Sequence, residues 1–300
     1  MPVNQLLKRS FPWAYSLYVD WQRKTLPERV SSILSSTRPS VYLDSEDLFL
    51  QLQSEYAKWW PEYEYDPFNN WTRAVSRQEA LFKYECLRGQ GLKVLESGCG
   101  DGVTGYLLKA YGHKVVLCDI EDWREERARA ISFVRADMCG RIPLRSSQFD
   151  LILSYNAFEH VPDPRSTLLE FLRVCKPHGY IFIDFNPLYC SALGLHAFCF
   201  TFPYPQFLFS PQFIESKVRI LGVRDLGRIS YSLQPTNKWR LNQYRDLWTS
   251  PGFETVSLLE EVDARHLSIV ESFPKAFRGQ GLTIDDLITS HVTVLLRKKS

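Results

Sequence analysis

The stretch from Val94 to Gly102 reads Val-Leu-Glu-Ser-Gly-Cys-Gly-Asp-Gly and constrains the fold of this 300-residue chain more than any other segment. A short apolar run leads into an acidic residue, Glu96, and glycine then recurs at every second position up to Gly102. A helical pattern of apolar residues begins at Val103. Because glycine has no Cβ, such a turn lets the backbone come close to a ligand. The order of strand, glycine turn and helix therefore predicts a nucleotide-type cofactor site.

The composition narrows the class of protein. A hydrophobic content of 45% and a charged content of 23% are typical of a soluble globular domain, and a net charge of +2 does not favour a nucleic-acid partner. The seven cysteines form no C-x-x-C pair, which indicates free thiols in a reducing compartment and hence a cytoplasmic location. No uninterrupted apolar run of about 18 residues occurs, so we expect no transmembrane span. The composition leaves the oligomeric state open.

The pattern beyond residue 91 alternates between strands and helices. Repeated β-α-β units with short apolar strands predict a doubly wound α/β fold, with a parallel sheet covered on both faces. We expect a helical N-terminal extension over residues 1–90 and the main domain over 91–300. The expected strands are 93–97, 114–118, 131–135, 150–154, 180–185, 253–259 and 290–297, and the expected helices include 103–111, 121–130, one from residue 164 and 241–248.

The N-terminal extension carries its own helix signals. Asp44 is a plausible N-cap for a helix through Trp60, and residues 61–73 have the composition of a loop. The capping box Ser76-x-x-Glu79 predicts a second helix that runs through Cys86. The aromatic segment 11–21 suits a helix packed on the domain, with contact to a membrane surface as the alternative.

Residues 186–250 interrupt the alternating rhythm and form an expected insertion after the fifth strand. Eight aromatic residues lie between Tyr189 and Phe213. They suit either a cap over a substrate pocket or a second small hydrophobic core, and the sequence does not decide between the two.

Two ligand classes suit a glycine turn after a first strand. A dinucleotide site needs G-x-G-x-x-G, but Val103 occupies the last position of that pattern and Glu96 would repel a pyrophosphate. S-adenosylmethionine carries no phosphate, and its cationic amino group can be attracted by an acid such as Glu96. The residues therefore favour S-adenosylmethionine, with a nicotinamide oxidoreductase as the alternative.

Six segments, taken in order, resemble the class I S-adenosylmethionine-dependent methyltransferases, in the small-molecule group often called type 11 or type 12. The resemblance covers about residues 92–185 and the last strand. The matching segments are Glu96–Gly102, Asp119 at the end of the second strand, Asp137-Met138 after the third, Phe149–Ser154, Glu159–Pro164 and Arg173–Gly179.

The resemblance implies a Rossmann-like seven-stranded methyltransferase sheet with one antiparallel strand at its edge. It places Asp119 on the ribose hydroxyls, Asp137 near the adenine and Asn156 near the methionine end of the cofactor, although Asp137 also suits a turn cap. The expected cofactor-binding residues are Glu96, Gly98, Cys99, Gly100, Asp119, Asp137, Met138 and Asn156.

Two histidines are candidates for a catalytic base. His160 follows the fourth strand in a Glu-His pair that is often structural in the family, and His196 lies in the expected insertion, where it also suits a buried packing role. In the methyltransferases of ubiquinone biosynthesis the comparable segment reads E-x-x-E-H and binds a metal. Asn156 occupies the first of those positions here, so we expect no metal.

The expected function is methyl transfer to a small-molecule acceptor, with oxygen slightly favoured over nitrogen or carbon. The segment Asn186-Pro-Leu-Tyr189 is similar to the N-P-P-Y motif of amino-group methyltransferases, but that motif follows the fourth strand rather than the fifth. The alternative from another class is a catalytically silent cofactor-binding protein that acts as an interaction partner.

Overall fold

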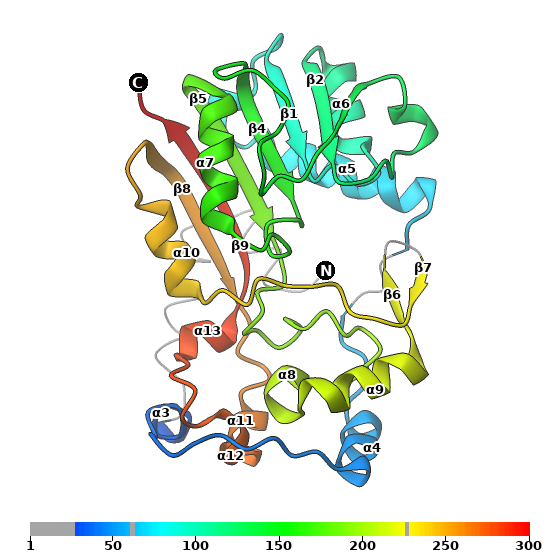
Figure 1. The fold of residues 1–300 in the computed structure, drawn as a ribbon, viewed down its shortest axis with the longest axis vertical. Coiled ribbons are helices and arrows are strands. Elements are labelled where there is room, and N and C mark those ends of the chain that lie inside the picture. The colour runs from blue at the N-terminus through cyan, green and yellow to red at the C-terminus, as the bar shows by residue number, and fades with distance from the viewer. Residues whose placement is uncertain (1–27, 61–63, 226–227) are drawn as a thin grey trace.

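A seven-stranded sheet forms the upper part of the molecule in Figure 1, a computed structural model that describes residues 28–60, 64–225 and 228–300. The strands lie in the order β3-β2-β1-β4-β5-β9-β8. Their bounds are β1 Lys93–Ser97, β2 Lys114–Asp119, β3 Ser132–Arg135, β4 Phe149–Tyr155, β5 Cys175–Phe185, β8 Phe253–Val262 and β9 Thr289–Lys298. The expectation for residues 11–21 lies outside the described residues.

The sheet confirms the doubly wound α/β class. Strands β1 to β5 pair in parallel, and β9 runs antiparallel to both of its neighbours. The position expected for the antiparallel strand was wrong, because β9 lies between β5 and β8 rather than at the edge. Strand β8 pairs with the side of β9 that faces away from β5, so β8 rather than β9 is the edge strand of the sheet.

Helices cover both faces of the sheet because its central strands are apolar on both sides. In β1, Val94 packs with Leu108 on one face and Leu95 packs with Phe171 on the other. Two helices, α5 and α6, lie over the first face, and α7 and α10 lie over the second (Figure 1). Their bounds are α5 Pro67–Leu81, α6 Val103–Tyr111, α7 Pro164–Val174 and α10 Leu241–Trp248.

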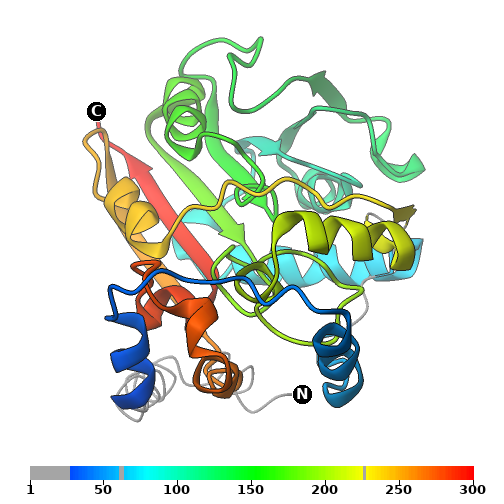
Figure 2. The ribbon, with the colours of Figure 1, turned by 60° about the horizontal axis from the view of Figure 1, so that its bottom comes forward.

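A helical lobe lies below the carboxyl ends of the parallel strands and comes forward in Figure 2. It has its own core, in which Phe49 meets the rings of Phe200, Phe202 and Phe209. Most aromatics of the insertion therefore build a second core rather than a pocket lining. The lobe contains α3 Glu28–Leu34, α4 Glu46–Glu55, α8 Pro205–Leu208, α9 Pro211–Leu221, α11 Ser268–Ser272, α12 Pro274–Phe277 and α13 Ile284–Ile288, with a hairpin of β6 Val223–Asp225 and β7 Arg228–Ser230 beside it.

Packing divides the chain differently from the expected insertion at 186–250. Helix α10 packs in the core of the sheet, through residues such as Tyr244 and Trp248. Residues 263–288, between β8 and β9, pack in the core of the lobe instead. The lobe is thus assembled from three separate parts of the chain, which include α3 and α4 of the N-terminal extension.

The expected N-terminal helices were partly wrong. Ser45 caps α4, which ends at Glu55, while Asp44 accepts hydrogen bonds from the backbone and hydroxyl of Ser210. Helix α5 begins inside the expected loop, because Asp66 caps it and Pro67 takes its first position. The supposed capping box at residues 76–79 therefore lies within a helix, and a single 3₁₀ turn covers Glu85–Leu87.

The helix expected over 121–130 is absent, and this segment is a loop with one 3₁₀ turn at Glu126–Ala128. The Arg124 guanidinium binds Asp122, donates to the Ile131 carbonyl at 2.8 Å and lies over the Phe133 ring. These contacts hold Arg124 across the loop, so local side-chain bonding replaces the helical ladder. All seven cysteines are free, as predicted.

In the part of the chain that the structure describes, no helix has the length and apolar character that crossing a membrane requires.

Candidate functional site

A cavity of about 1590 Å³ lies between the sheet and the helical lobe. The ends of β1, β2 and β4 contribute Gly98, Asp119 and Asn156 to its wall, and the lobe side contributes Trp59 and His196. This is the place where parallel α/β sheets bind ligands, because the loops beyond the carboxyl ends of the strands meet there.

The glycine turn after β1 needs glycine for steric reasons. The backbone amides of Gly98 and Cys99 donate to the Cys118 carbonyl at 2.9 and 3.1 Å, which ties the turn to β2. Gly98 has a φ of 72°, and a Cβ there would lie 2.5 Å from the Ala157 Cβ. At Gly100 a Cβ would meet nothing within 4 Å, so this part of the turn is open to the cavity.

Asp119 closes the glycine turn from the end of β2. Its Oδ2 accepts from the Gly100 amide at 2.9 Å and its Oδ1 accepts from the Ile120 amide at 2.8 Å. Burial raises the pKa of Asp119, and the same amides oppose this shift by favouring the carboxylate. Because each carboxylate oxygen can accept more than one hydrogen bond, Asp119 retains capacity toward a ligand in the cavity.

Asp137 and Met138 also line the cavity, next to the glycine turn. The Asp137 Oδ1 accepts from the Cys139 amide at 2.8 Å, so the residue serves as the turn cap that the sequence offered as its alternative role. It does so while facing the cavity. The two interpretations of Asp137 are therefore compatible in this geometry.

Glu96 and Cys99 are not among the residues that line the cavity, and their expected contact with the cofactor stays a prediction. The Glu96 side chain is 1% exposed and lies behind the turn, against Gly105 of α6. Burial raises the pKa of Glu96 to about 8, although Arg77 opposes the shift. A protonated, buried acid in this position packs behind the turn and presents no charge to the cavity.

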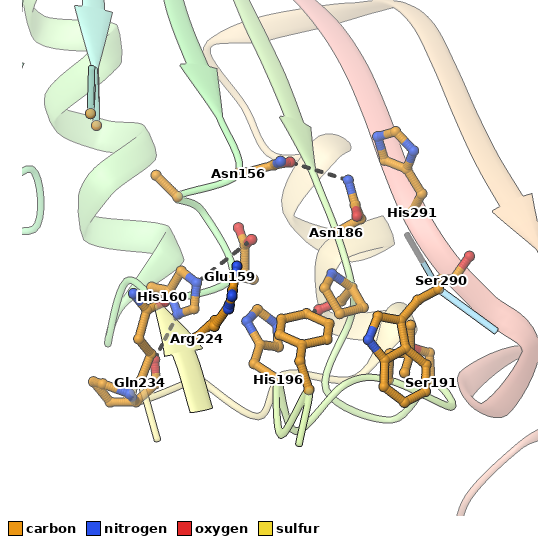
Figure 3. A pocket seen from close by; sticks show the side chains of 18 of the residues that line it. Asn156, Glu159, His160, Asn186, Ser191, His196, Arg224, Gln234, Ser290 and His291 are labelled. Atoms are coloured by element: carbon orange, nitrogen blue, oxygen red, sulfur yellow. Dashed lines mark hydrogen bonds and ion pairs between the residues drawn. The ribbon is translucent and has the colours of Figure 1, made fainter. Parts of the chain in front are cut away.

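Asn156 lines the cavity at the end of β4. Its φ of 47° is a left-handed conformation that asparagine tolerates better than most residues. Its side-chain oxygen accepts from the Asn186 amide at 3.1 Å. The sequence discounted Asn186 because it follows the fifth strand, but β4 and β5 are neighbours and the two asparagines meet (Figure 3).

His160 and His196 come together although 35 residues separate them in the sequence, and Glu159 lies beside them (Figure 3). The two imidazole centroids are 4.8 Å apart with an angle of 82° between the rings. The His160 Nδ1 is 2.9 Å from the Pro235 carbonyl oxygen, and the His196 Nε2 is 3.2 Å from that of Pro187. We call Glu159, His160 and His196 the histidine corner of the cavity.

Burial shifts the titration of two members of the histidine corner. It lowers the pKa of His196 to about 3, and the neighbouring His160 adds to this effect, so His196 is neutral and a weak base. Burial raises the pKa of the Glu159 carboxyl to about 8. Glu159 is 3% exposed, and its Oε2 has no hydrogen-bond partner among the described residues.

The histidine corner also has the donor set of a metal site. One ligand atom from each of its three residues lies within 4.8 Å of the others. The sequence argument against a metal considered only the segment after the fourth strand, where Asn156 replaces an acid. The structure supplies a third ligand group, His196, from the segment after the fifth strand.

Sequence reasoning missed the acid pair around His291. The His291 Nε2 is 3.0 Å from the Asp184 Oδ1, and its Nδ1 is 3.1 Å from the Glu261 Oε1, at the wall of the cavity. Asp184 is the penultimate residue of an apolar strand, a position close to the strand-end position that marked Asp119. The pairing of β9 with β5 and β8 was needed to bring the three residues together.

A family model and several curated relatives match part of the chain. Residues 95–183 match the family model described as a methyltransferase domain. The chain is 28% identical over 162 residues to a ubiquinone biosynthesis O-methyltransferase of Bordetella avium, which covers 50% of this chain and 64% of that protein. It is 30% identical over 106 residues to the tRNA 5-carboxymethoxyuridine methyltransferase of Escherichia coli, which covers 32% of this chain and 41% of that protein.

The chain therefore spans less than two thirds of the length of these curated relatives. Among solved structures, an S-adenosylmethionine dependent methyltransferase from Mesorhizobium loti is similar with a TM-score of 0.47 and 18% identity. This similarity covers 74% of this chain and 98% of that one.

Proposed function

Since the chain belongs to the class I S-adenosylmethionine-dependent methyltransferases, we propose that it transfers the methyl group of this cofactor to an oxygen atom of a small molecule. One observation carries the proposal. A single cavity is lined both by Asp119 and the glycine turn and by the histidine corner. Donor and acceptor can thus meet in one cavity.

The residues present suit S-adenosylmethionine. The open backbone at Gly100 lets an adenosyl group approach the turn, and Asp119 has acceptor capacity for the ribose hydroxyls. Asp137, Met138 and Asn156 line the same cavity, and we assign the first two to the adenine and Asn156 to the methionine end of the cofactor. When bound, the cofactor supplies a sulfonium methyl group, whose S–C bond breaks as an acceptor lone pair forms the new O–C bond, which leaves a neutral thioether and one proton.

The protein has to position the acceptor and assist the loss of that proton. His196 suits orientation rather than proton transfer, because it stays neutral down to a pH of about 3. The Pro235 carbonyl orients the His160 ring, since a carbonyl accepts a hydrogen bond and so places a proton on Nδ1. The acceptor hydroxyl is expected to face the Nε2 side of that ring.

The cavity wall favours an acceptor with an apolar or aromatic body. Trp59, Trp60 and Phe198 line the lobe side, opposite the polar groups of the sheet. Several curated relatives carry the name ubiquinone biosynthesis O-methyltransferase, which supports oxygen as the methylated atom. The pairing of Asn186 with Asn156 in the cavity is the specific observation that keeps a nitrogen acceptor as the second candidate.

A direct experiment combines cofactor titration with an acceptor screen. The chain is titrated calorimetrically with S-adenosylmethionine and with S-adenosylhomocysteine, and then incubated with matched phenols, anilines and aliphatic alcohols. Methylated products are identified by mass spectrometry. Methylation of hydroxyl compounds supports the proposal, whereas methylation of amines alone favours the second candidate. Cofactor binding without any turnover would favour the silent binding protein.

A further inference from the structure

We propose that Glu159, His160 and His196 bind a divalent first-row transition metal ion, with its remaining coordination positions open to an oxygen atom of the acceptor. The proposal rests on the geometry of the histidine corner, and its second half also rests on the proposed function. The segment after β4 provides only two of the ligand residues, Glu159 and His160. The third, His196, comes from the expected insertion after β5.

The donor atoms have the right chemistry and spacing. Two imidazole nitrogens and one carboxylate oxygen form a set that zinc enzymes use at catalytic sites, with one position left for water or substrate. The three ligand atoms lie within 4.8 Å of one another. A tetrahedral site with bonds of about 2.1 Å needs ligand atoms about 3.4 Å apart, so small side-chain rotations close the difference.

Backbone carbonyls orient both imidazoles for coordination. A carbonyl only accepts hydrogen bonds, so the contact with Pro235 places a proton on the His160 Nδ1 and leaves Nε2 as the coordinating nitrogen. The contact with Pro187 places a proton on the His196 Nε2 and leaves Nδ1. Metal-binding histidines characteristically donate their second nitrogen to such an acceptor, which holds the ring in place.

Glu159 provides an independent indication. Its Oε2 is buried without a hydrogen-bond partner among the described residues, and its Oε1 lies 3.8 Å from the His160 Nε2. A buried carboxylate oxygen without a partner is costly, and coordination to a cation removes that cost. Glu159 and both histidines line the cavity, so a bound ion would be open on the substrate side, as at a catalytic rather than a structural zinc site.

Coordination would serve the reaction directly. A hydroxyl oxygen bound to a divalent ion loses its proton to solvent far more readily than a free hydroxyl does. The acceptor would then attack the methyl carbon as an oxyanion, without a protein group that stores the proton.

The test begins with metal binding by the untagged full chain. The protein is stripped with a chelator and titrated with Zn²⁺ and with Co²⁺, and the bound metal is counted by mass spectrometry. We expect about one equivalent of Zn²⁺, and a Co²⁺ complex without the intense near-ultraviolet charge-transfer band of a thiolate ligand, which excludes the seven cysteines. Mg²⁺, which prefers oxygen ligands, should not compete.

Matched variants localise the site. Glu159→Gln, His160→Asn and His196→Asn should each weaken Zn²⁺ binding at least tenfold. Glu96→Gln and His113→Asn alter a buried acid and a buried histidine away from the corner and should leave Zn²⁺ binding unchanged. Calorimetric affinity for S-adenosylmethionine checks that each corner variant is folded, and the more exposed His160 provides a corner variant with little risk to folding.

Substoichiometric Zn²⁺, or Zn²⁺ binding that the corner variants do not weaken, would overturn the metal site. Full methylation of hydroxyl compounds by the stripped enzyme would overturn the coordination of the acceptor oxygen. One equivalent of metal at the corner, together with no turnover on any acceptor, would instead count against the proposed function and leave the site standing.

Discussion

Three buried carboxyl groups, those of Glu96, Glu159 and Asp184, feel the charge of the same arginine. Arg77 of α5 lies over the Tyr155 ring, and its charge lowers the pKa values of Glu96, Glu159 and Asp184. For Glu96 and Glu159 burial still prevails and raises the pKa to about 8, while His291 helps to keep Asp184 ionised. The protonation of each acid is thus set by how many polar partners reach it.

The raised pKa of Glu96 predicts how stability depends on pH. Its carboxyl has a pKa near 4.5 in the unfolded chain and about 8 in the folded protein, so between these values the folded state holds a proton that the unfolded state has released. The free energy of unfolding therefore falls as pH rises through this range, by at most about 1.4 kcal/mol per pH unit for one group. Glu96→Gln should flatten that decline.

Urea unfolding at pH 6.5, 7.25 and 8 measures the effect, since His196 titrates below this window. The variant should gain stability relative to the wild type as pH rises. Parallel curves for the two proteins across this window would show that Glu96 is already ionised in the folded state.

The role of Asp119 in cofactor binding can be tested by comparison with Asp150, a second aspartate near one end of a strand. Asp119→Ala should weaken S-adenosylmethionine binding by about 1–3 kcal/mol, or roughly 5- to 150-fold in Kd, because the ribose hydroxyls lose their acceptor. Asp150→Ala is the control, because Asp150 binds Lys176 and the Lys93 amide at the opposite end of the sheet. Calorimetry on both variants decides the question, and equal affinity of Asp119→Ala and wild type would refute the ribose assignment.

At the scale of elements, the sequence predicts best where a local signal and the burial pattern agree. Strand β1, the glycine turn and α6 form as expected, because apolar residues and glycines meet every requirement of that segment. Asp163-Pro164 correctly predicts the start of α7. The same pair at Asp66-Pro67 starts α5, but the polar and aromatic composition around it suggested a loop.

The histidine corner could be predicted only in part. His160 and His196 were both candidates, but as separate ones, because nothing in the sequence measures the distance between the segments after β4 and β5. That distance depends on the parallel pairing of the two strands, which places Tyr155 opposite Asp184. Tertiary contacts of this kind, and the pairing of Asp184 with His291, have no local signature.

Three glycine-to-alanine substitutions, two in the glycine turn and one outside it, should separate an effect on stability from an effect on cofactor binding. Gly91, Gly98 and Gly100 all have positive φ, so alanine costs each about 1–2 kcal/mol of backbone strain. Gly98→Ala adds a clash with Ala157 and should lose the most stability. Gly100→Ala meets open cavity space and should fold, but its methyl group should occupy cofactor space and weaken cofactor binding at least tenfold.

Gly91→Ala is the matched control, since its Cβ also meets nothing within 4 Å and it does not line the cavity. Thermal unfolding and calorimetry on the three variants give stability and affinity separately. The assignment of the turn to the cofactor fails if Gly100→Ala binds S-adenosylmethionine as tightly as Gly91→Ala does.

At the scale of the whole molecule, each of the two hydrophobic cores positions a different part of the cavity wall. The core of the sheet positions the glycine turn, Asp119 and Asp137, while the core of the lobe holds the wall that carries Trp59 and Phe198. His196 lies on the segment after β5, which packs in the lobe, and it meets His160 and Glu159 at the histidine corner (Figure 3). Cofactor binding therefore depends mainly on one core, and the catalytic geometry depends on both.

This division predicts a variant that binds cofactor but does not turn over. Phe49 of α4 is 3% exposed and contacts four phenylalanine rings of the lobe, so Phe49→Ala should cost about 3–5 kcal/mol in the lobe core. Leu50→Ala, on the exposed face of the same helix, should cost less than about 0.5 kcal/mol. Because the lobe holds His196 but not Asp119, Phe49→Ala should lose methylation rate far more than S-adenosylmethionine affinity. Calorimetry and turnover on one acceptor at 15 °C compare the two losses, and a parallel loss of both would mean that the lobe and the sheet unfold as a single cooperative unit.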